Sequence, residues 1–212
     1  MSSKATKTLT QNPAVWVAAI FIVALLVVAL SRDGASDSPA GNTIDPGHQL
    51  AELASPDPAI GAIAPRIVGV GLDGESIIIE PDGAARILGF FAHWCPHCQA
   101  ELPRVTDWLA TTTLPDGVEV IAVSSAVDAA GDNFPPETWF EETGWPMAVI
   151  ADDLGAIAAD FGLTAFPFWV VLDEDGAVVT RRTGSIPVEE LDELVDHITP
   201  TEVLSRSIGT PS

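Results

Sequence analysis

Hydrophobic and polar positions divide the chain into one long apolar run, a polar stretch and a region of short alternating segments. The apolar run from Ala14 to Leu30 has seventeen residues and no charge, and Ser31 closes it. A helix that spans a bilayer needs about 20 apolar residues, with about 17 as the lower limit. The pattern therefore predicts a transmembrane helix at residues 14–31, preceded by a cytoplasmic N-terminus at residues 1–13.

A cleaved signal peptide is the alternative interpretation of this run. The apolar region of a signal peptide normally has about 7–15 residues and precedes a small-x-small cleavage site, which Ala29-Leu30-Ser31 matches poorly. We therefore favour a retained anchor. Lys4 and Lys7 favour the inner side of the membrane for the N-terminus. Both interpretations predict an extracytoplasmic domain, and the first predicts a single-pass protein of the cell membrane.

Residues 32–64 are rich in Ser, Asp, Gly, Pro and Ala and show no sustained periodicity. This composition is typical of a flexible linker, although its end, around Pro56–Pro65, is compatible with contact to the domain that follows. Short apolar segments begin near residue 65 and continue to about residue 200. We expect a single domain over residues 65–200 and a loose tail at residues 201–212.

The segments of this domain alternate between the periods of strands and of helices. A hairpin is expected at residues 67–71 and 76–80 around Asp73-Gly74, and a second one at residues 168–172 and 177–183. Further strands are expected at residues 86–92, 118–124 and 147–151, and helices at residues 96–111, 136–143, 154–161 and 187–198. Asp152 or Asp153 would cap the third of these helices. Strands that alternate with helices predict a mixed α/β sheet with helices on both faces.

Charge and cysteine content narrow the functional class. The formal net charge is −21, which disfavours binding to nucleic acid and to anionic lipid headgroups. A solubilising surface explains this charge most simply, and a salt-adapted source is the alternative. The only two cysteines lie three positions apart, so they cannot join distant parts of a disulfide-stabilised scaffold.

The most informative segment is Cys95-Pro96-His97-Cys98, which lies between a predicted buried strand and a predicted helix. A helix start offers unpaired N–H groups and the positive end of the helix dipole, and both favour a thiolate. Pro96 suits the first helical turn, where its missing N–H costs little. One turn of helix brings Cys98 beneath Cys95. We expect Cys95 to be the exposed attacking sulfur and Cys98 to be the shielded resolving sulfur.

His97 lies between the two cysteines, where partial positive charge would stabilise a thiolate and make the pair more oxidising. A solvated spectator is the alternative for His97, and the spectator interpretation is favoured for His93. A closed zinc site needs four ligands, and only these two histidines lie near the cysteines. We therefore expect no metal and no cofactor besides a redox-active Cys95–Cys98 disulfide. A non-catalytic metal-binding or metallochaperone module remains the alternative function.

Three motifs together resemble a known family. WCPHC follows a strand, ELP follows the second cysteine, and FGLTAFPFWVVLDEDG lies near the end of the domain. Over about residues 65–200 the chain is similar to the extracytoplasmic thioredoxin-like proteins of the TlpA and ResA type. The resemblance implies a thioredoxin fold with an N-terminal hairpin extension. It also implies a thiol–disulfide oxidoreductase that exchanges disulfides with exported proteins, for example in cytochrome c maturation.

The resemblance also implies roles for individual residues. Phe166-Pro167 would form a cis peptide that faces the dithiol and offers the backbone before Pro167 to a substrate peptide. Trp94 and Pro96 would complete the substrate-binding surface. Glu101 of the ELP stretch would lie near the dithiol and tune proton transfer, and an exposed helix carboxylate is the alternative.

The direction of electron flow stays open at the level of the sequence. The CPHC sequence resembles that of strongly oxidising periplasmic enzymes, whereas the scaffold resembles reductants. The acid that cytoplasmic thioredoxins bury behind the second cysteine falls on Gly89. A reductant would need a membrane transporter of reducing equivalents as its partner, and an oxidant would need a membrane reoxidase.

Overall fold

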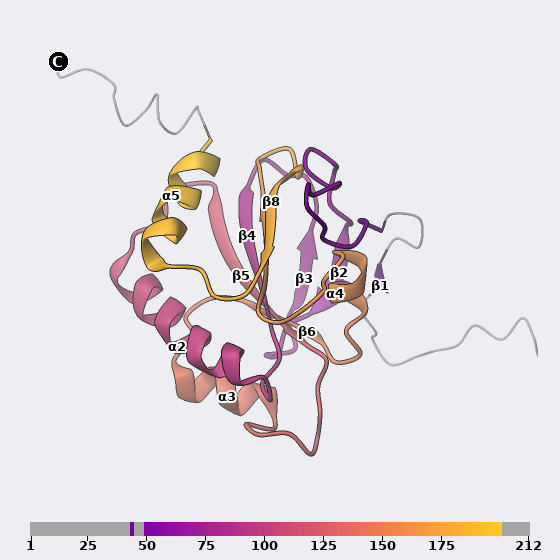
Figure 1. The fold of residues 1–212 in the computed structure, drawn as a ribbon. Helices are drawn as coiled ribbons and strands as arrows, with labels where there is room; N and C mark the ends of the chain where they lie inside the picture. Colours follow the sequence, from indigo (N-terminus) through magenta and orange to yellow (C-terminus); the bar gives the residue numbers. More distant parts are fainter. Residues whose placement is uncertain (1–42, 45–48, 201–212) are drawn as a thin grey trace, which may run out of the picture. The chain divides into compact units, whose positions relative to one another are not determined.

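The computed structural model describes residues 43–44 and 49–200 of the chain (Figure 1). The predicted N-terminus, transmembrane helix and tail lie outside the described residues, as does most of the predicted linker. Within the described ranges, no helix combines the length and apolar character that crossing a membrane requires.

A five-stranded mixed sheet forms the centre of the domain, with its strands in the order β6-β5-β4-β7-β8. Its strands are β4 (Ala85–Phe91), β5 (Val118–Ser125), β6 (Val149–Asp152), β7 (Phe168–Leu172) and β8 (Val178–Thr183). The β4, β5 and β6 strands run parallel, while β7 and β8 pair in antiparallel fashion. Strands β4 and β7 are buried along their whole length because both faces of the sheet are covered.

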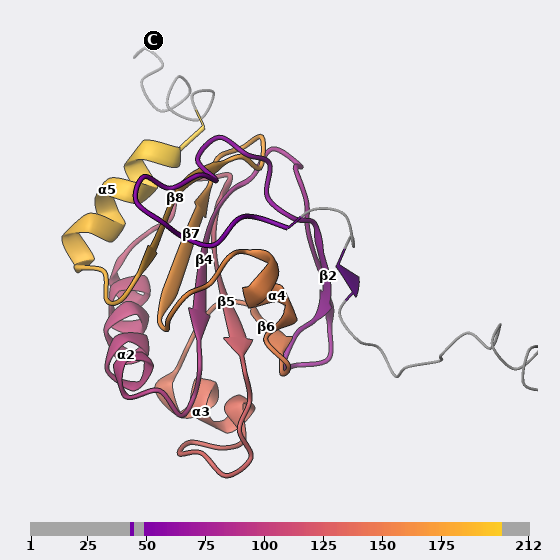
Figure 2. The same cartoon turned by 45° about the vertical axis from the view of Figure 1, so that its right-hand side comes forward.

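Alternate side chains of β4 enter two separate hydrophobic cores. Ile87 and Phe91 pack under α2 (Pro96–Thr111), α3 (Pro136–Thr143) and α5 (Val188–Ile198). Leu88 and Phe90 face the opposite core, which includes α4 (Ala156–Asp160). Figures 1 and 2 show α2, α3 and α5 on one side of the sheet and α4 on the other. The predicted mixed sheet with helices on both faces is confirmed.

The N-terminal hairpin extension is also present. Strand β2 (Ile67–Val70) pairs with β3 (Ser76–Ile79) around the Asp73-Gly74 turn, and β1 (Thr43–Ile44) pairs with the other edge of β2. A single bridge between Gly71 and Ile150 joins the hairpin to the edge strand β6. The hairpin therefore lies beside the central sheet rather than within it.

The prediction of a flexible linker at residues 32–64 is wrong for residues 49–64, because this stretch packs against the domain. Leu50 and Ala59 are buried in the core that contains α4. The Leu50 N–H donates to the Asp160 carbonyl at 2.8 Å, and the Gly61 N–H donates to the Val178 carbonyl at 2.8 Å. The stretch is irregular and mostly exposed, but its two buried side chains and its backbone hydrogen bonds attach it to the domain.

Two elements begin two residues later than predicted. The edge strand β6 begins at Val149 rather than at residue 147, and α4 spans Ala156–Asp160 rather than residues 154–161. The Asp152 carboxylate accepts hydrogen bonds from the backbone N–H groups of Ile157 and Ala158, both at 3.0 Å. The N-cap residue of α4 is Gly155 rather than Asp152 or Asp153, although the Asp152 side chain satisfies two N–H groups of the first turn.

Candidate active site

The two cysteines lie where β4 ends and α2 begins. Cys95 is the N-cap residue, with extended φ and ψ of −80° and 119°, and Pro96 occupies the first helical turn. The Cys95 N–H donates to the Ala92 carbonyl at 3.0 Å, and the Gln99 N–H donates to the Cys95 carbonyl at 3.0 Å. Helix α2 therefore begins immediately after Cys95, as the spacing predicts.

Burial distinguishes the two sulfur-bearing side chains, although less than expected. Cys95 keeps 8% of its surface exposed, whereas Cys98 has 0%. Both belong to the core beneath α2. Cys95 is thus the sulfur that a protein substrate can reach, but its site is a small opening in an apolar surface rather than a freely exposed thiol.

Burial raises the pKa of the Cys98 thiol far above the value of an ordinary cysteine. The Ala92 N–H points at Cys98 Sγ from 3.4 Å and opposes this shift. The neighbouring Cys95 and the charge of Glu101 raise the pKa further. Cys98 is therefore a neutral thiol that must lose its proton before it can attack the Cys95 sulfur.

Glu101 is buried, with an exposed fraction of 1%, so the exposed alternative for this carboxylate is wrong. One carboxylate oxygen accepts a hydrogen bond from the Ile186 N–H at 2.9 Å, and the other pairs with the Arg104 guanidinium. These contacts tie α2 to the segment that leads into α5. They also compensate the buried charge, which otherwise carries a high desolvation cost.

His97 is exposed on the first turn of α2, next to the exposed Pro96. Any positive charge on this imidazole is surrounded by water, which screens its effect on a sulfur. That His97 makes the cysteine pair more oxidising stays a prediction.

Trp94 and Phe166 form an aromatic pair beside the dithiol. Their rings meet edge to face, with centroids 6.1 Å apart, and 37% of Trp94 is exposed. The Phe166–Pro167 peptide bond is cis, as the family resemblance implies. Pro167 is buried at the start of β7, and its carbonyl accepts a hydrogen bond from the Gly184 N–H at 2.8 Å. A partly exposed apolar surface therefore surrounds Cys95.

His93 has a position that sequence reasoning missed. Its side chain is only 1% exposed, and both ring nitrogens contact the backbone of the loop after β5. The contacts reach residues 35 and 39 positions further along the chain. No local pattern in the sequence signals such a contact.

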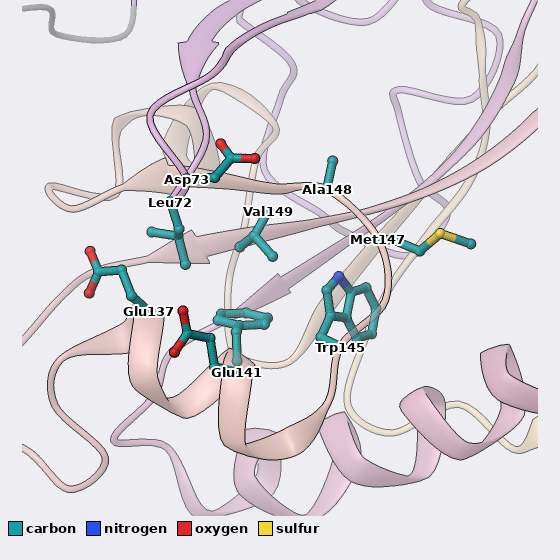
Figure 3. Close-up of a pocket in the computed structure, with 9 residues that line it drawn as sticks. Leu72, Asp73, Glu137, Glu141, Trp145, Met147, Ala148 and Val149 are labelled. Atoms are coloured by element: carbon teal, nitrogen blue, oxygen red, sulfur yellow. The ribbon is translucent and has the colours of Figure 1, made fainter.

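A surface cavity of about 220 Å³ is lined by residues of the β2–β3 turn, of α3 and of the segment that leads into β6 (Figure 3). Glu137 and Glu141 of α3, Asp73 of the β2–β3 turn and Trp145 are among its lining residues. Neither cysteine lines it. Within residues 49–200, no group of three or more His, Cys, Asp and Glu side chains is arranged to hold a metal ion.

Comparison with known proteins decides the family. The family model described as Redoxin matches residues 64–196. The chain belongs to the Redoxin family. It is 31% identical over 143 residues to the thiol-disulfide oxidoreductase ResA of Bacillus thuringiensis, covering 66% of this chain and 79% of that protein.

Two further similarities agree with this membership. The chain is 30% identical over 143 residues to the thiol:disulfide interchange protein DsbE homolog of Paracoccus denitrificans, covering 65% of this chain and 73% of that protein. The crystal structure of StoA from Bacillus subtilis matches the fold with a TM-score of 0.52 and 24% identity, covering 65% of this chain and 98% of StoA. The chain is a thiol–disulfide oxidoreductase of the ResA and DsbE type with a thioredoxin-like fold.

Proposed function

We propose that this oxidoreductase reduces disulfides of exported proteins at the outer face of the cell membrane. The unequal burial of Cys95 and Cys98 carries this proposal, because one sulfur can meet a macromolecular substrate while the other stays protected. Cys95, Cys98, Trp94, Phe166 and Pro167 form the reacting and binding groups. Residues 14–31 anchor the domain to the membrane.

The reaction proceeds in two exchange steps. The Cys95 thiolate attacks one sulfur of the client disulfide, which forms a Cys95–client bond and releases one client thiolate. Cys98 then loses its proton and attacks Cys95 Sγ, which forms the Cys95–Cys98 bond and releases the second client sulfur. Two electrons pass from the dithiol to the client, and the two released client thiolates take up two protons. A membrane partner that donates two electrons restores the dithiol, so no cofactor is needed besides the cysteines.

The reductive direction is supported by the surroundings of Cys98. A strong oxidant is one whose reduced form is stabilised as a thiolate. Here burial and the nearby Glu101 disfavour ionisation of Cys98. His97, which would favour an oxidant, is exposed to solvent. Together these features favour electron donation by the dithiol.

Trapping of clients tests the roles of the two cysteines in the full chain, purified in detergent. Cys98→Ala should accumulate mixed disulfides with client proteins, because the second attack cannot occur. Cys95→Ser should form none and should abolish insulin reduction. The double variant Cys95→Ser with Cys98→Ala serves as the control for unspecific adducts. Normal turnover by Cys95→Ser would refute the assignment.

The reduction potential tests the direction separately. Equilibration of the full chain with glutathione should give a value near that of thioredoxin, about −270 mV. A value near about −120 mV, that of the oxidant DsbA, would contradict the reductive proposal while leaving the exchange chemistry intact.

A further inference from the structure

We propose that His93 is a positioning residue that fixes the loop of residues 126–134 beside Cys95, and that this loop holds protein clients during exchange. The inference rests on the proposed function and deepens it. The client it predicts is an extended peptide with an apolar side chain next to its cysteine. Residues 126–134 are called the client loop below.

The hydrogen bonds of the His93 ring define its protonation state. The Asp128 backbone N–H donates to Nε2 at 3.1 Å, so Nε2 must be unprotonated. The neutral ring therefore carries its proton on Nδ1, which donates to the Asp132 carbonyl at 2.6 Å. One imidazole thus binds the client loop at two points and uses both of its nitrogens.

The backbone of His93 makes the same connection a second time. Its carbonyl accepts hydrogen bonds from Gln99 Nε2 of α2 at 2.9 Å and from Asn133 Nδ2 of the client loop at 3.1 Å. The neighbouring Trp94 donates through Nε1 to the Ala126 carbonyl at 2.7 Å. The two residues before Cys95 therefore contact the client loop at its beginning, middle and end.

The client loop depends on these contacts because its own conformation is unfavourable. Ala126 and Asn133 adopt positive φ values of 53° and 59°, a region that non-glycine residues rarely occupy. Most residues of the loop are exposed and bury little apolar surface. Gly131 lies so close to Trp94 that a β-carbon there would stand 2.7 Å from Trp94 Cβ. The Ala126 and Val127 N–H groups donate to the Asp152 and Asp153 carbonyls at 3.0 and 2.9 Å. Polar contacts to residues 93 and 94 hold the loop further along.

The client loop extends the apolar surface around Cys95. Phe134 is 50% exposed, and its ring lies 6.1 Å from the His93 ring between centroids. Trp94, which donates a hydrogen bond to the loop, is 37% exposed. Exposed aromatic side chains beside a reactive sulfur favour an apolar residue in the client.

Steady-state kinetics of the full chain test the proposal with two substrates. Insulin is the protein disulfide, and oxidised glutathione is a small disulfide that needs little beyond Cys95. His93→Leu should raise KM for insulin roughly tenfold, the size expected for the loss of the two hydrogen bonds of the imidazole ring. The kcat for insulin and the rate with oxidised glutathione should stay within about twofold. His197→Leu, at an exposed histidine of α5, is the matched control and should change neither.

The exposed Phe134 provides a variant that does not depend on the folding of His93 variants. Phe134→Ala should raise KM for insulin several-fold and leave the rate with oxidised glutathione unchanged. An unchanged KM in this variant would overturn the client loop. An equal loss with both substrates in His93→Leu would also overturn it, since the dithiol itself would then be disturbed. If Cys95→Ser still turns over insulin, the proposed function fails instead.

Discussion

At the scale of the residue, aromatic packing leaves no room for a side chain at Gly89. It lies in the middle of β4, paired with Trp169 of β7. A β-carbon at Gly89 would stand 2.8 Å from the Phe91 ring and 2.9 Å from the Trp169 ring. The Trp169 indole is fully buried and meets Phe91 edge to face at 5.4 Å. The Phe91 and Trp169 rings therefore fill the space that a side chain at position 89 would need.

Gly89→Ala should therefore destabilise the fold by about 1–3 kcal/mol, because two rigid aromatic rings must move to admit one methyl group. Urea unfolding followed by tryptophan fluorescence measures the change. Gly74→Ala, at a turn where no atom lies within 4 Å of the added carbon, separates crowding from backbone strain at φ +84°. Equal stability of Gly89→Ala and the native chain would contradict this account of the packing.

At the scale of the element, a buried ion pair attaches residues 49–64 to the domain. The Arg181 side chain of β8 is 0% exposed and pairs with the Asp57 carboxylate, whose side chain is 11% exposed. Arg181 Nη1 also donates to the carbonyls of Ala51 at 2.8 Å and Phe161 at 2.7 Å. The guanidinium thus joins the segment before β2, the end of α4 and an edge strand of the sheet.

Asp57→Asn should destabilise the domain by about 3 kcal/mol, since it leaves a buried guanidinium without its counterion. The hydrogen bond from Arg181 lowers the pKa of Asp57 in the folded state. The stability it contributes is therefore present above the unfolded pKa and is lost as the pH falls through the folded value. Chemical unfolding at several pH values measures both effects.

Glu80→Gln provides the matched control for this prediction. It removes the Arg66–Glu80 pair, whose side chains are 46% and 44% exposed, and should cost less than about 1 kcal/mol. If Asp57→Asn and Glu80→Gln lower the free energy of unfolding equally, burial does not strengthen the Asp57–Arg181 pair.

At the scale of the whole molecule, excess negative charge opposes compaction. The formal net charge is −21. Some of the acidic side chains lie near one another, such as Asp73, Glu137 and Glu141 around the cavity in Figure 3. Like charges held close together in the folded state repel one another, and the repulsion is relieved on unfolding. Dissolved salt should therefore stabilise this chain more than a chain of balanced charge.

Raising NaCl from about 0.01 M to about 1 M shortens the Debye length from about 30 Å to about 3 Å. We expect Tm at pH 7.5 to rise by several degrees, as measured by circular dichroism. Near the sequence pI of about 4.1 the net charge approaches zero, so the same addition of salt should have little effect. A Tm that falls with salt at pH 7.5 would contradict the argument.

Local sequence patterns determined the elements and the place of the chemistry. Pro96 and the spacing of Cys95 and Cys98 predict a helix that begins at the first sulfur, and α2 does begin at Pro96. Asp73-Gly74 predicts the hairpin turn, and continuous apolar runs predict β4 and β7. These features depend on neighbouring residues within a turn or a strand, so the sequence alone carries them.

Tertiary structure alone decided which polar residues became buried. Glu101 is fixed by a backbone group 85 positions away, Arg181 by Asp57 at 124 positions, and His93 by loop residues at 35 and 39 positions. Whether a polar side chain is buried depends on partners that the fold brings together, and no local pattern specifies them. For the same reason residues 49–64, which have the composition of a linker, belong to the folded domain.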